Sequence, residues 1–314
     1  MRAFVENSAG EKWELPAAER WELEYGVGTP CDSFCLCCPW TVGMTADPAA
    51  WARFYAEHEG KRVFSGVVDE CEVSLTARGR YLELSGRGMA ALLLDNEALG
   101  QDYQVATLAD ILRDHVTPYG IEVLGGQLPA VSRFRVDTGS SEWTVLEEFV
   151  RAAGGETPRF DPWGRLLLGV WEEKEQVTIG AGTPVTALLR RDKRYGVLSE
   201  VLVRDRYSGA VQRVKNEEFW SRGGQARRVV TMPGRAQADS MRRSGREQLE
   251  RSGREQLEIE ITLPVPFFAM PGELVSVERS GLGEIGLFRV ARSTVGMDTE
   301  GYWTRLVLRK PENV

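Results

Sequence analysis

The stretch that decides the fold is Gly60-Lys-Arg-Val-Phe-Ser-Gly-Val-Val-Asp-Glu70, followed by Tyr81-Leu-Glu-Leu-Ser-Gly-Arg-Gly-Met-Ala-Ala-Leu-Leu-Leu-Asp95. Both parts contain alternating apolar and polar residues, which is typical of half-buried β-strands. The second part leads through Gly86-Arg-Gly88 into a short apolar run that favours a helix. The sequence therefore predicts paired strands at residues 63–68 and 72–75 and another strand at residues 81–85, which leads into a helix.

A helical segment follows at residues 107–121. Thr107 is a candidate N-cap with Asp110 at the third helical position, a variant of the capping box. Pro118 and Gly120 end the helix. A second helix begins at Ser140 or Ser141, carries an apolar stripe at helical spacing, and ends at Gly154-Gly155.

Strand patterns surround this helical part. Residues 13–16, 20–25 and 34–42 read as strands before it, and residues 159–169 read as a hairpin with its turn at Asp161-Pro-Trp-Gly164. The β pattern resumes at residue 188, a charged helical segment covers residues 236–258, and strands return after Pro271-Gly272. We expect a mainly β fold with inserted α+β: two barrel-like β-domains plus smaller α+β domains.

The same pattern gives the predicted domain limits. Residues 1–95 form a first barrel-like β-domain, and residues 96–185 form an α+β domain. Residues 186–235 begin a second β-domain, the charged helical segment 236–258 interrupts it, and residues 259–314 complete it.

Composition excludes several classes of protein. The 314 residues carry a net charge of −7 with both signs mixed, which gives no electrostatic case for nucleic-acid binding. No apolar run reaches the ~18 residues of a membrane-spanning helix, and the first residues predict no signal peptide. The five cysteines are an odd number and do not suggest a secreted disulfide framework, and two histidines make a histidine-based centre improbable.

Four of the cysteines lie close together: Cys31, Cys35, Cys37 and Cys38. Their spacing is wrong for paired zinc knuckles, and a continuous strand would separate Cys31 from Cys37 by about 20 Å. Alternation places Cys31, Cys35 and Cys37 on one strand face and Cys38 on the other. We expect a structural role and no metal.

The remaining candidate sites have structural explanations. The carboxylate pairs Asp69/Glu70 and Glu147/Glu148 are expected on solvated faces. Helix capping explains Ser140 and Ser141, which could otherwise be a nucleophile with His115 or His58 as a distant base. No phosphate-binding loop is present among the glycines at 79, 86, 88, 180 and 182, and the nine tryptophans suggest core packing over a sugar platform. We predict no catalytic, cofactor-binding or metal-binding residue.

The charged segment contains an identical tandem repeat, Arg243-Ser-Gly-Arg-Glu-Gln-Leu-Glu250 and Arg251-Ser-Gly-Arg-Glu-Gln-Leu-Glu258. An eight-residue period rotates a helix by about 80° between copies, so both copies cannot present the same face. We interpret the repeat as a tolerated surface duplication with one copy partly looped. Deletion of residues 251–258 is then expected to change the thermal midpoint by only a few degrees.

The order of these elements resembles the baseplate hub of contractile, myovirus-type phage tails and prophage tail-like particles. The resemblance extends over residues 15–310 and rests on these segments: Val63-Phe-Ser-Gly-Val-Val-Asp69, Gly86-Arg-Gly88, Pro118-Tyr-Gly-Ile121, the Ser-Glu-Trp helix at 141–150, Phe160-Asp-Pro-Trp-Gly-Arg-Leu166, the charged strand at 197–206, Met270-Pro-Gly-Glu-Leu-Val275, Gly286-Leu-Phe-Arg-Val290 and Trp303-Thr-Arg-Leu-Val-Leu308. The tandem repeat and the cysteine-rich strand depart from that family's pattern.

This resemblance implies a structural protein without enzymatic activity. It implies a homotrimeric ring that links the central spike to the tail tube or a tube-initiator protein and contacts baseplate wedge proteins. Its place would be the virion tail baseplate, assembled in the cytoplasm of the bacterial host. A tail-associated cell-wall hydrolase or a carbohydrate-binding β-module is the alternative; a recognisable catalytic domain or glycan-array binding would distinguish them.

Overall fold

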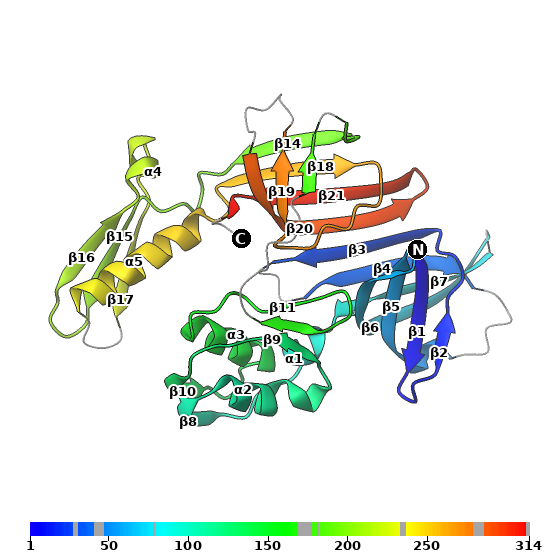
Figure 1. The fold of residues 1–314 in the computed structure, drawn as a ribbon, viewed down its shortest axis with the longest axis horizontal. Coiled ribbons are helices and arrows are strands. Elements are labelled where there is room, and N and C mark those ends of the chain that lie inside the picture. The colour runs from blue at the N-terminus through cyan, green and yellow to red at the C-terminus, as the bar shows by residue number, and fades with distance from the viewer. Residues whose placement is uncertain are drawn as a thin grey trace. The chain divides into compact units, whose positions relative to one another are not determined.

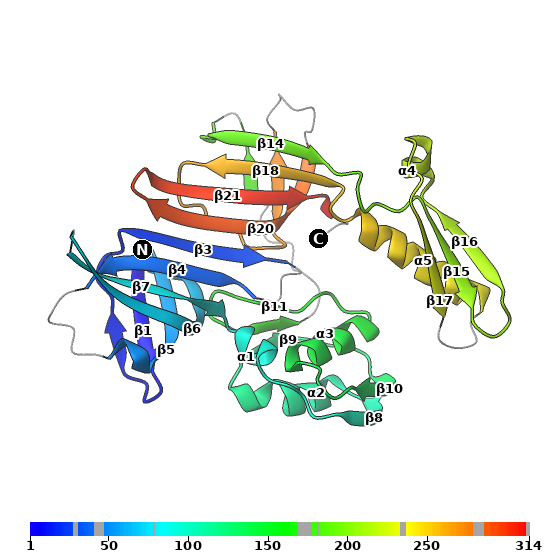
Figure 2. The ribbon, with the colours of Figure 1, turned by 180° about the vertical axis from the view of Figure 1, so that it is seen from behind.

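The structure is a computed structural model that describes residues 1–27, 31–40, 47–77, 79–168, 177–180, 182–232, 237–278 and 286–311 (Figures 1 and 2). The chain divides into two compact units. Unit 1 contains residues 1–174, 263–272 and 292–305, and unit 2 contains residues 175–262, 273–291 and 306–314. The fold is mainly β, as predicted, and the described strands close no barrel.

The β part of unit 1 is an antiparallel sheet in the order β3-β4-β7-β6-β5-β1-β2, with residues 292–297 of β20 beside β3. Its elements are β1 (Arg2–Asn7), β2 (Lys12–Glu14), β3 (Arg20–Gly26), β4 (Ser33–Pro39), η1 (Pro48–Ala50), β5 (Trp51–His58), β6 (Lys61–Thr76) and β7 (Gly79–Gly88). Strands β20 (Gly286–Asp298) and β21 (Gly301–Arg309) contribute residues to both units. Buried aromatic rings fill the core, where Phe34 stacks on Phe54 with ring centres 3.8 Å apart.

The Gly86-Arg-Gly88 segment of the deciding stretch forms the end of strand β7, and glycine is required at Gly86. Gly86 and Gly66 lie where β6 and β7 come closest, and a Cβ at Gly86 would be 2.1 Å from the Val67 carbonyl oxygen. The register between the strands shifts between Val68 and Glu70, which leaves Asp69 as a bulge residue. Arg87 then pairs with Asp69 and with Asp95, at 2.7 Å in each case. This double ion pair fixes the exit of β7 into α1 (Ala91–Leu94).

The α+β part of unit 1 follows the predicted helices closely. Its elements are β8 (Gln101–Ala106), α2 (Leu108–His115), η2 (Thr117–Tyr119), β9 (Val123–Gly125), β10 (Val131–Val136), α3 (Glu142–Ala152), β11 (Arg159–Phe160) and β12 (Leu166–Leu168). Thr107 and Asp110 form the capping box, and Ser141 accepts a hydrogen bond from the Thr144 backbone N–H as the cap of α3. The hairpin turn at residues 161–164 forms as predicted.

Unit 2 contains a second group of strands and a small module. Its elements are β13 (Val177–Ile179), β14 (Ala187–Asp192), β15 (Glu200–Asp205), β16 (Val211–Lys215), α4 (Glu217–Ser221), β17 (Arg227–Met232), α5 (Ala238–Gly253), β18 (Leu257–Leu263) and β19 (Leu274–Val277). In the module, strands β16-β15-β17 form one sheet, and α5 lies along one face of it (Figure 1). Val201, Val203, Met241 and Leu249 are buried between helix and sheet.

The tandem repeat adopts two different structures. The first copy is helical and lies within α5, where Gly245 and Leu249 are buried against the module sheet. The second copy contains the end of α5, a turn and the start of β18. In β18, Leu257 is buried and Glu258 pairs with Lys193 at 2.9 Å and Arg309 at 2.7 Å. The second copy is partly looped, as expected, but the predicted helical segment does not reach residue 258, because the last two residues of the copy belong to strand β18.

No helix among the described residues is both long enough and apolar enough to cross a lipid bilayer.

Candidate functional site

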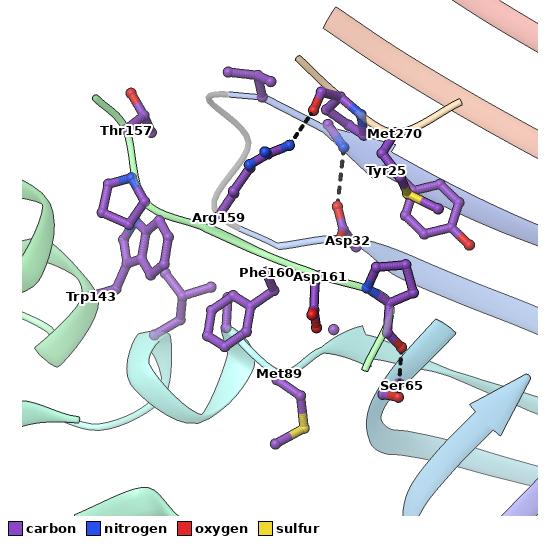
Figure 3. Close-up of a pocket in the computed structure, with 18 of the residues that line it drawn as sticks. Tyr25, Asp32, Ser65, Met89, Trp143, Thr157, Arg159, Phe160, Asp161 and Met270 are labelled. Carbon is purple, nitrogen blue, oxygen red and sulfur yellow. Dashed lines mark hydrogen bonds between the residues drawn. The ribbon is translucent and has the colours of Figure 1, made fainter. Parts of the chain in front are cut away.

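A cavity of about 270 Å³ lies in unit 1, between the ends of β3 and β7 and helix α3 (Figure 3). The backbone of residues 157–162 runs along it. Its walls are largely apolar, with these large side chains: Tyr25, Phe64, Met89, Trp143, Phe160 and Met270. Concave apolar sites with a few polar groups are the usual form of ligand pockets, so this cavity is the candidate functional site.

The segment along the cavity is held by hydrogen bonds to both sides. Ser65 Oγ donates to the Pro162 carbonyl oxygen at 2.8 Å, and the Arg159 guanidinium donates to the Pro271 carbonyl oxygen at 2.8 Å. Asp161 accepts hydrogen bonds from the backbone N–H groups of Trp163 and Arg165, and it also pairs with the Arg165 side chain. Ser65, Arg159 and Asp161 therefore form hydrogen bonds within the protein that hold the segment and its hairpin turn in place.

Asp32 is a carboxyl group of this cavity whose pKa is shifted toward neutral pH. Its carboxylate accepts one hydrogen bond, from the Gly26 N–H at 3.1 Å. Removal from water raises the pKa of Asp32 to about 7, although the Gly26 hydrogen bond opposes the shift. Asp32 can therefore hold a proton near neutral pH, and Glu147 provides a second carboxyl group in the lining.

Asp32→Asn is expected to stabilise the protein at pH 8 and to have little effect at pH 4. Because the pKa is raised in the folded protein, Asp32 stays protonated there between about pH 4 and pH 7, whereas it is already deprotonated in the unfolded chain. The wild type therefore loses stability as the pH rises from about 4 to 7. The asparagine variant has no such loss, and we expect a gain on the order of 1–2 kcal/mol at pH 8, allowing for solvent in the cavity. Urea denaturation at the two pH values measures the difference. An equal effect at both pH values would contradict this assignment.

The cysteines do not gather into one site. Cys31 lies before the start of strand β4, so the prediction that it belongs to the strand face is wrong. Its thiol donates a hydrogen bond to the Gly88 carbonyl oxygen at 3.3 Å. Cys35 is exposed, and Cys37 and Cys38 are buried on opposite faces. Burial raises the pKa of Cys31 and of Cys38 to about 12. Within the described residues, no group of three or more Cys, His, Asp or Glu side chains could hold a metal ion.

Protein purified without added metal is therefore expected to contain far less than one equivalent of zinc or iron. Neutral thiols are poor ligands because a metal binds the thiolate, and the raised pKa values favour the neutral form. Elemental analysis of the wild type and of a variant with serine at positions 31, 35, 37 and 38 tests this expectation. Stoichiometric metal that disappears in the variant would contradict it.

The two histidines lie in structural surroundings. His58 lies beside the rings of Phe268 and Tyr302. His115 is buried, with Nδ1 2.5 Å from Glu142 Oε2 and Nε2 3.1 Å from the Tyr103 hydroxyl. Tyr119 donates to the other oxygen of Glu142 at 3.0 Å. The adjacent Ser141 is hydrogen-bonded to Thr144, whereas His115 contacts Tyr103 and Glu142, so Ser141 and His115 are not a nucleophile and base pair.

This buried network was not predicted from the sequence. In the sequence, Glu142 resembles the acidic residues that commonly occupy the first turn of a helix at the surface, yet in α3 it is only 7% exposed. The one available signal was a histidine on the apolar face of α2. Buried polar networks of this kind stabilise a unique packing because each member needs its partners.

The other predicted candidates also separate. In the first carboxylate pair, Asp69 forms an ion pair with Arg87, while Glu70 is exposed. In the second pair, Glu147 lines the cavity, while Glu148 is exposed and its carboxylate lies 3.5 Å from the Arg151 guanidinium. Three tryptophans are buried, at positions 21, 51 and 143, and Trp163 and Trp220 are exposed on separate parts of the chain. The exposed rings of Trp163 and Trp220 therefore do not belong to one continuous stretch of strand or helix.

Comparison with known proteins shows which fold this is. No protein-family model and no curated protein sequence matches the chain. The 43 kDa tail protein of prophage MuSo2 from Shewanella oneidensis has a similar structure, with a TM-score of 0.82, 18% identity, and coverage of 100% of this chain and 99% of that one. A tail protein from Neisseria meningitidis MC58 gives a TM-score of 0.80 at 17% identity, covering 99% and 98% of the two chains.

A third similar structure comes from a secretion system. The Escherichia coli c3393 protein is described as a component of the type VI secretion system with structural similarity to the T4 bacteriophage tail proteins gp27 and gp5. It gives a TM-score of 0.61 at 12% identity, covering 98% of this chain and 74% of that one. Over its whole length, the chain has the fold of prophage tail proteins.

Proposed function

We propose that the chain is the structural hub of a phage-like contractile tail baseplate, where it links the central spike to the tail tube. The observation that carries the proposal is the match to a prophage tail protein over essentially the full length of both chains. The similarity of the third relative to gp27 and gp5 supports the hub position within the tail. The proposed partners are two further copies of the chain, the spike, the tube or its initiator, and wedge proteins.

The proposed mechanism is geometric. A homotrimeric ring would present two β-rich units from each subunit, six in all, to the tube. The candidate side chains support a structural role because they are engaged in structural contacts: Ser141 caps α3, His115 is held by Glu142 and Tyr103, and Arg87 pairs with two aspartates. The ring would form in the host cytoplasm and function in the virion baseplate.

The mass of the assembly tests this proposal. The purified chain, mixed with the spike protein of the same particle at micromolar concentration, is expected to give a complex that contains three copies of the 35.1 kDa chain. Light scattering coupled to size exclusion measures the mass, and the spike alone is the control. A chain that stays monomeric with the spike present would contradict the hub assignment.

A hydrolase is the second candidate, and one observation favours it. Asp32, with a pKa near 7, and Glu147 line one cavity, and glycoside hydrolases use two carboxyl groups of which one is kept protonated. Peptidoglycan hydrolysis by the wild type, lost in both Asp32→Asn and Glu147→Gln, would support this function. Equal, background-level release of soluble fragments by all three proteins would exclude it for this cavity.

A further inference from the structure

One edge of strand β6 is unpaired in its second half. Residues 61–67 of β6 pair with β5, and residues 66–76 pair with β7. Beyond Val67, the strand therefore has β7 on one side and no partner strand on the other among the described residues. An exposed strand edge is a template for pairing with another chain unless it is blocked.

The side chains of this segment favour a protein partner of opposite charge. Residues 70–76 read Glu-Cys-Glu-Val-Ser-Leu-Thr, with two acidic residues and no basic one. Glu70 and Glu72 are exposed and form no ion pair with the described residues. Val73 is 49% exposed and Leu75 is 75% exposed. Exposed apolar side chains on an open strand edge are a feature of surfaces that another chain covers.

Strand β14 presents a second open edge with the complementary character. It pairs with β18 along residues 187–192 and has no other neighbour among the described strands. Residues 187–192 read Ala-Leu-Leu-Arg-Arg-Asp, with two basic residues and one acidic residue, and Arg190 pairs with Asp192 at 2.9 Å. Leu189 is 46% exposed, and the Arg191 side chain is 53% exposed with its nearest carboxylate, that of Glu258, at 3.9 Å.

We infer that the β6 edge (residues 70–76) of one copy pairs with the β14 edge (residues 187–192) of a second copy. The inference rests on the proposed ring and names the surfaces that would close it. The two edges are similar in length, carry net charges of opposite sign and expose apolar side chains. Because they are different surfaces of the same chain, the contact is head-to-tail, and repetition of such a contact generates a closed ring when the rotation permits. An acidic chain with one basic edge also favours a second copy over a nucleic acid as the occupant.

Charge reversal tests the pairing, starting from the wild-type trimer formed with the spike. The double variants Glu70→Arg/Glu72→Arg and Arg190→Glu/Arg191→Glu place like charges on the facing edges, and each is expected to weaken trimer formation roughly tenfold to a hundredfold. The variant with all four substitutions restores opposite charges and is expected to recover wild-type assembly. Glu217→Arg/Glu218→Arg is the matched control because it changes two exposed glutamates of α4 in the same way.

Sedimentation velocity over a concentration series measures trimer formation, and circular dichroism checks that each variant is folded. Leu75→Lys, at an exposed position, is a second probe that leaves the buried core intact and is also expected to weaken assembly. Trimers of wild-type strength in both double variants would overturn the edge pairing while leaving the hub function standing. Weakened variants whose four-substitution combination stays weak would also overturn the pairing. A wild type that is monomeric with the spike would overturn the hub function itself.

Discussion

Gly86→Ala is expected to prevent unit 1 from folding stably. An added Cβ would lie 2.1 Å from the Val67 carbonyl oxygen and 2.6 Å from a ring carbon of Phe34. The carbonyl belongs to strand β6 and the ring stacks on Phe54 in the core, so neither neighbour can move without separating paired strands or buried rings. We expect a loss of about 3 kcal/mol or more in the free energy of unfolding, the upper range for overpacking.

Urea denaturation and soluble yield measure this effect. Gly286→Ala is the matched control because Gly286 also lies in a strand, and the nearest atom to its added Cβ is 3.9 Å away. The control is expected to remain within about 0.5 kcal/mol of the wild type, as at most sites without strain. If both variants unfold at the wild-type urea concentration, the close approach of β6 and β7 is not required for the fold.

Deletion of residues 251–258 is expected to destabilise unit 2 strongly, in contrast to the small change that the sequence suggested. After the deletion, a single copy of the octapeptide precedes Ile259 and cannot serve as both helix and strand. If it stays helical, β18 loses the buried Leu257 and the ion pairs of Glu258 with Lys193 and Arg309. If it becomes the strand, α5 loses Leu249 and about two turns of helix from the face of the module sheet.

Either loss removes a buried leucine, which costs about 2–5 kcal/mol. For a unit of this size, we expect the thermal midpoint to fall by roughly 10 °C. Differential scanning calorimetry measures it, and Glu250→Ala is the control because Glu250 is exposed on α5. A midpoint within about 3 °C of the wild type would restore the view that the repeat is a tolerated duplication.

Local features of the fold were predictable because short-range chemistry controls them. The capping box of Thr107 and Asp110, the Ser141 cap and the turn at residues 161–164 all depend on neighbours within four residues. Alternation along residues 61–68 and 81–85 likewise follows from a sheet with one buried face. Such features are visible in a single sequence because the interacting groups are adjacent in it.

The candidate site was not predictable by the same reasoning. The cavity brings together Asp32, Ser65, Trp143 and Arg159, which lie far apart in the sequence. The pKa of Asp32 is raised by desolvation, a property of the packed environment that no spacing encodes. Glu142 and His115 are 27 positions apart, so their buried contact also required the tertiary structure.

The sequence by itself determined the mainly β character of the chain, the capped helices of the α+β part and the resemblance to tail hub proteins. The tandem repeat shows what only the tertiary structure decided. Two identical octapeptides have identical propensities, yet Glu250 is exposed on a helix and Glu258 is buried in a strand. The physical reason is that each copy follows the surface available to it: the module sheet buries Leu249 on a helix face, whereas β14 pairs with the backbone that begins at Leu257. Packing and strand pairing thus outweigh local propensity.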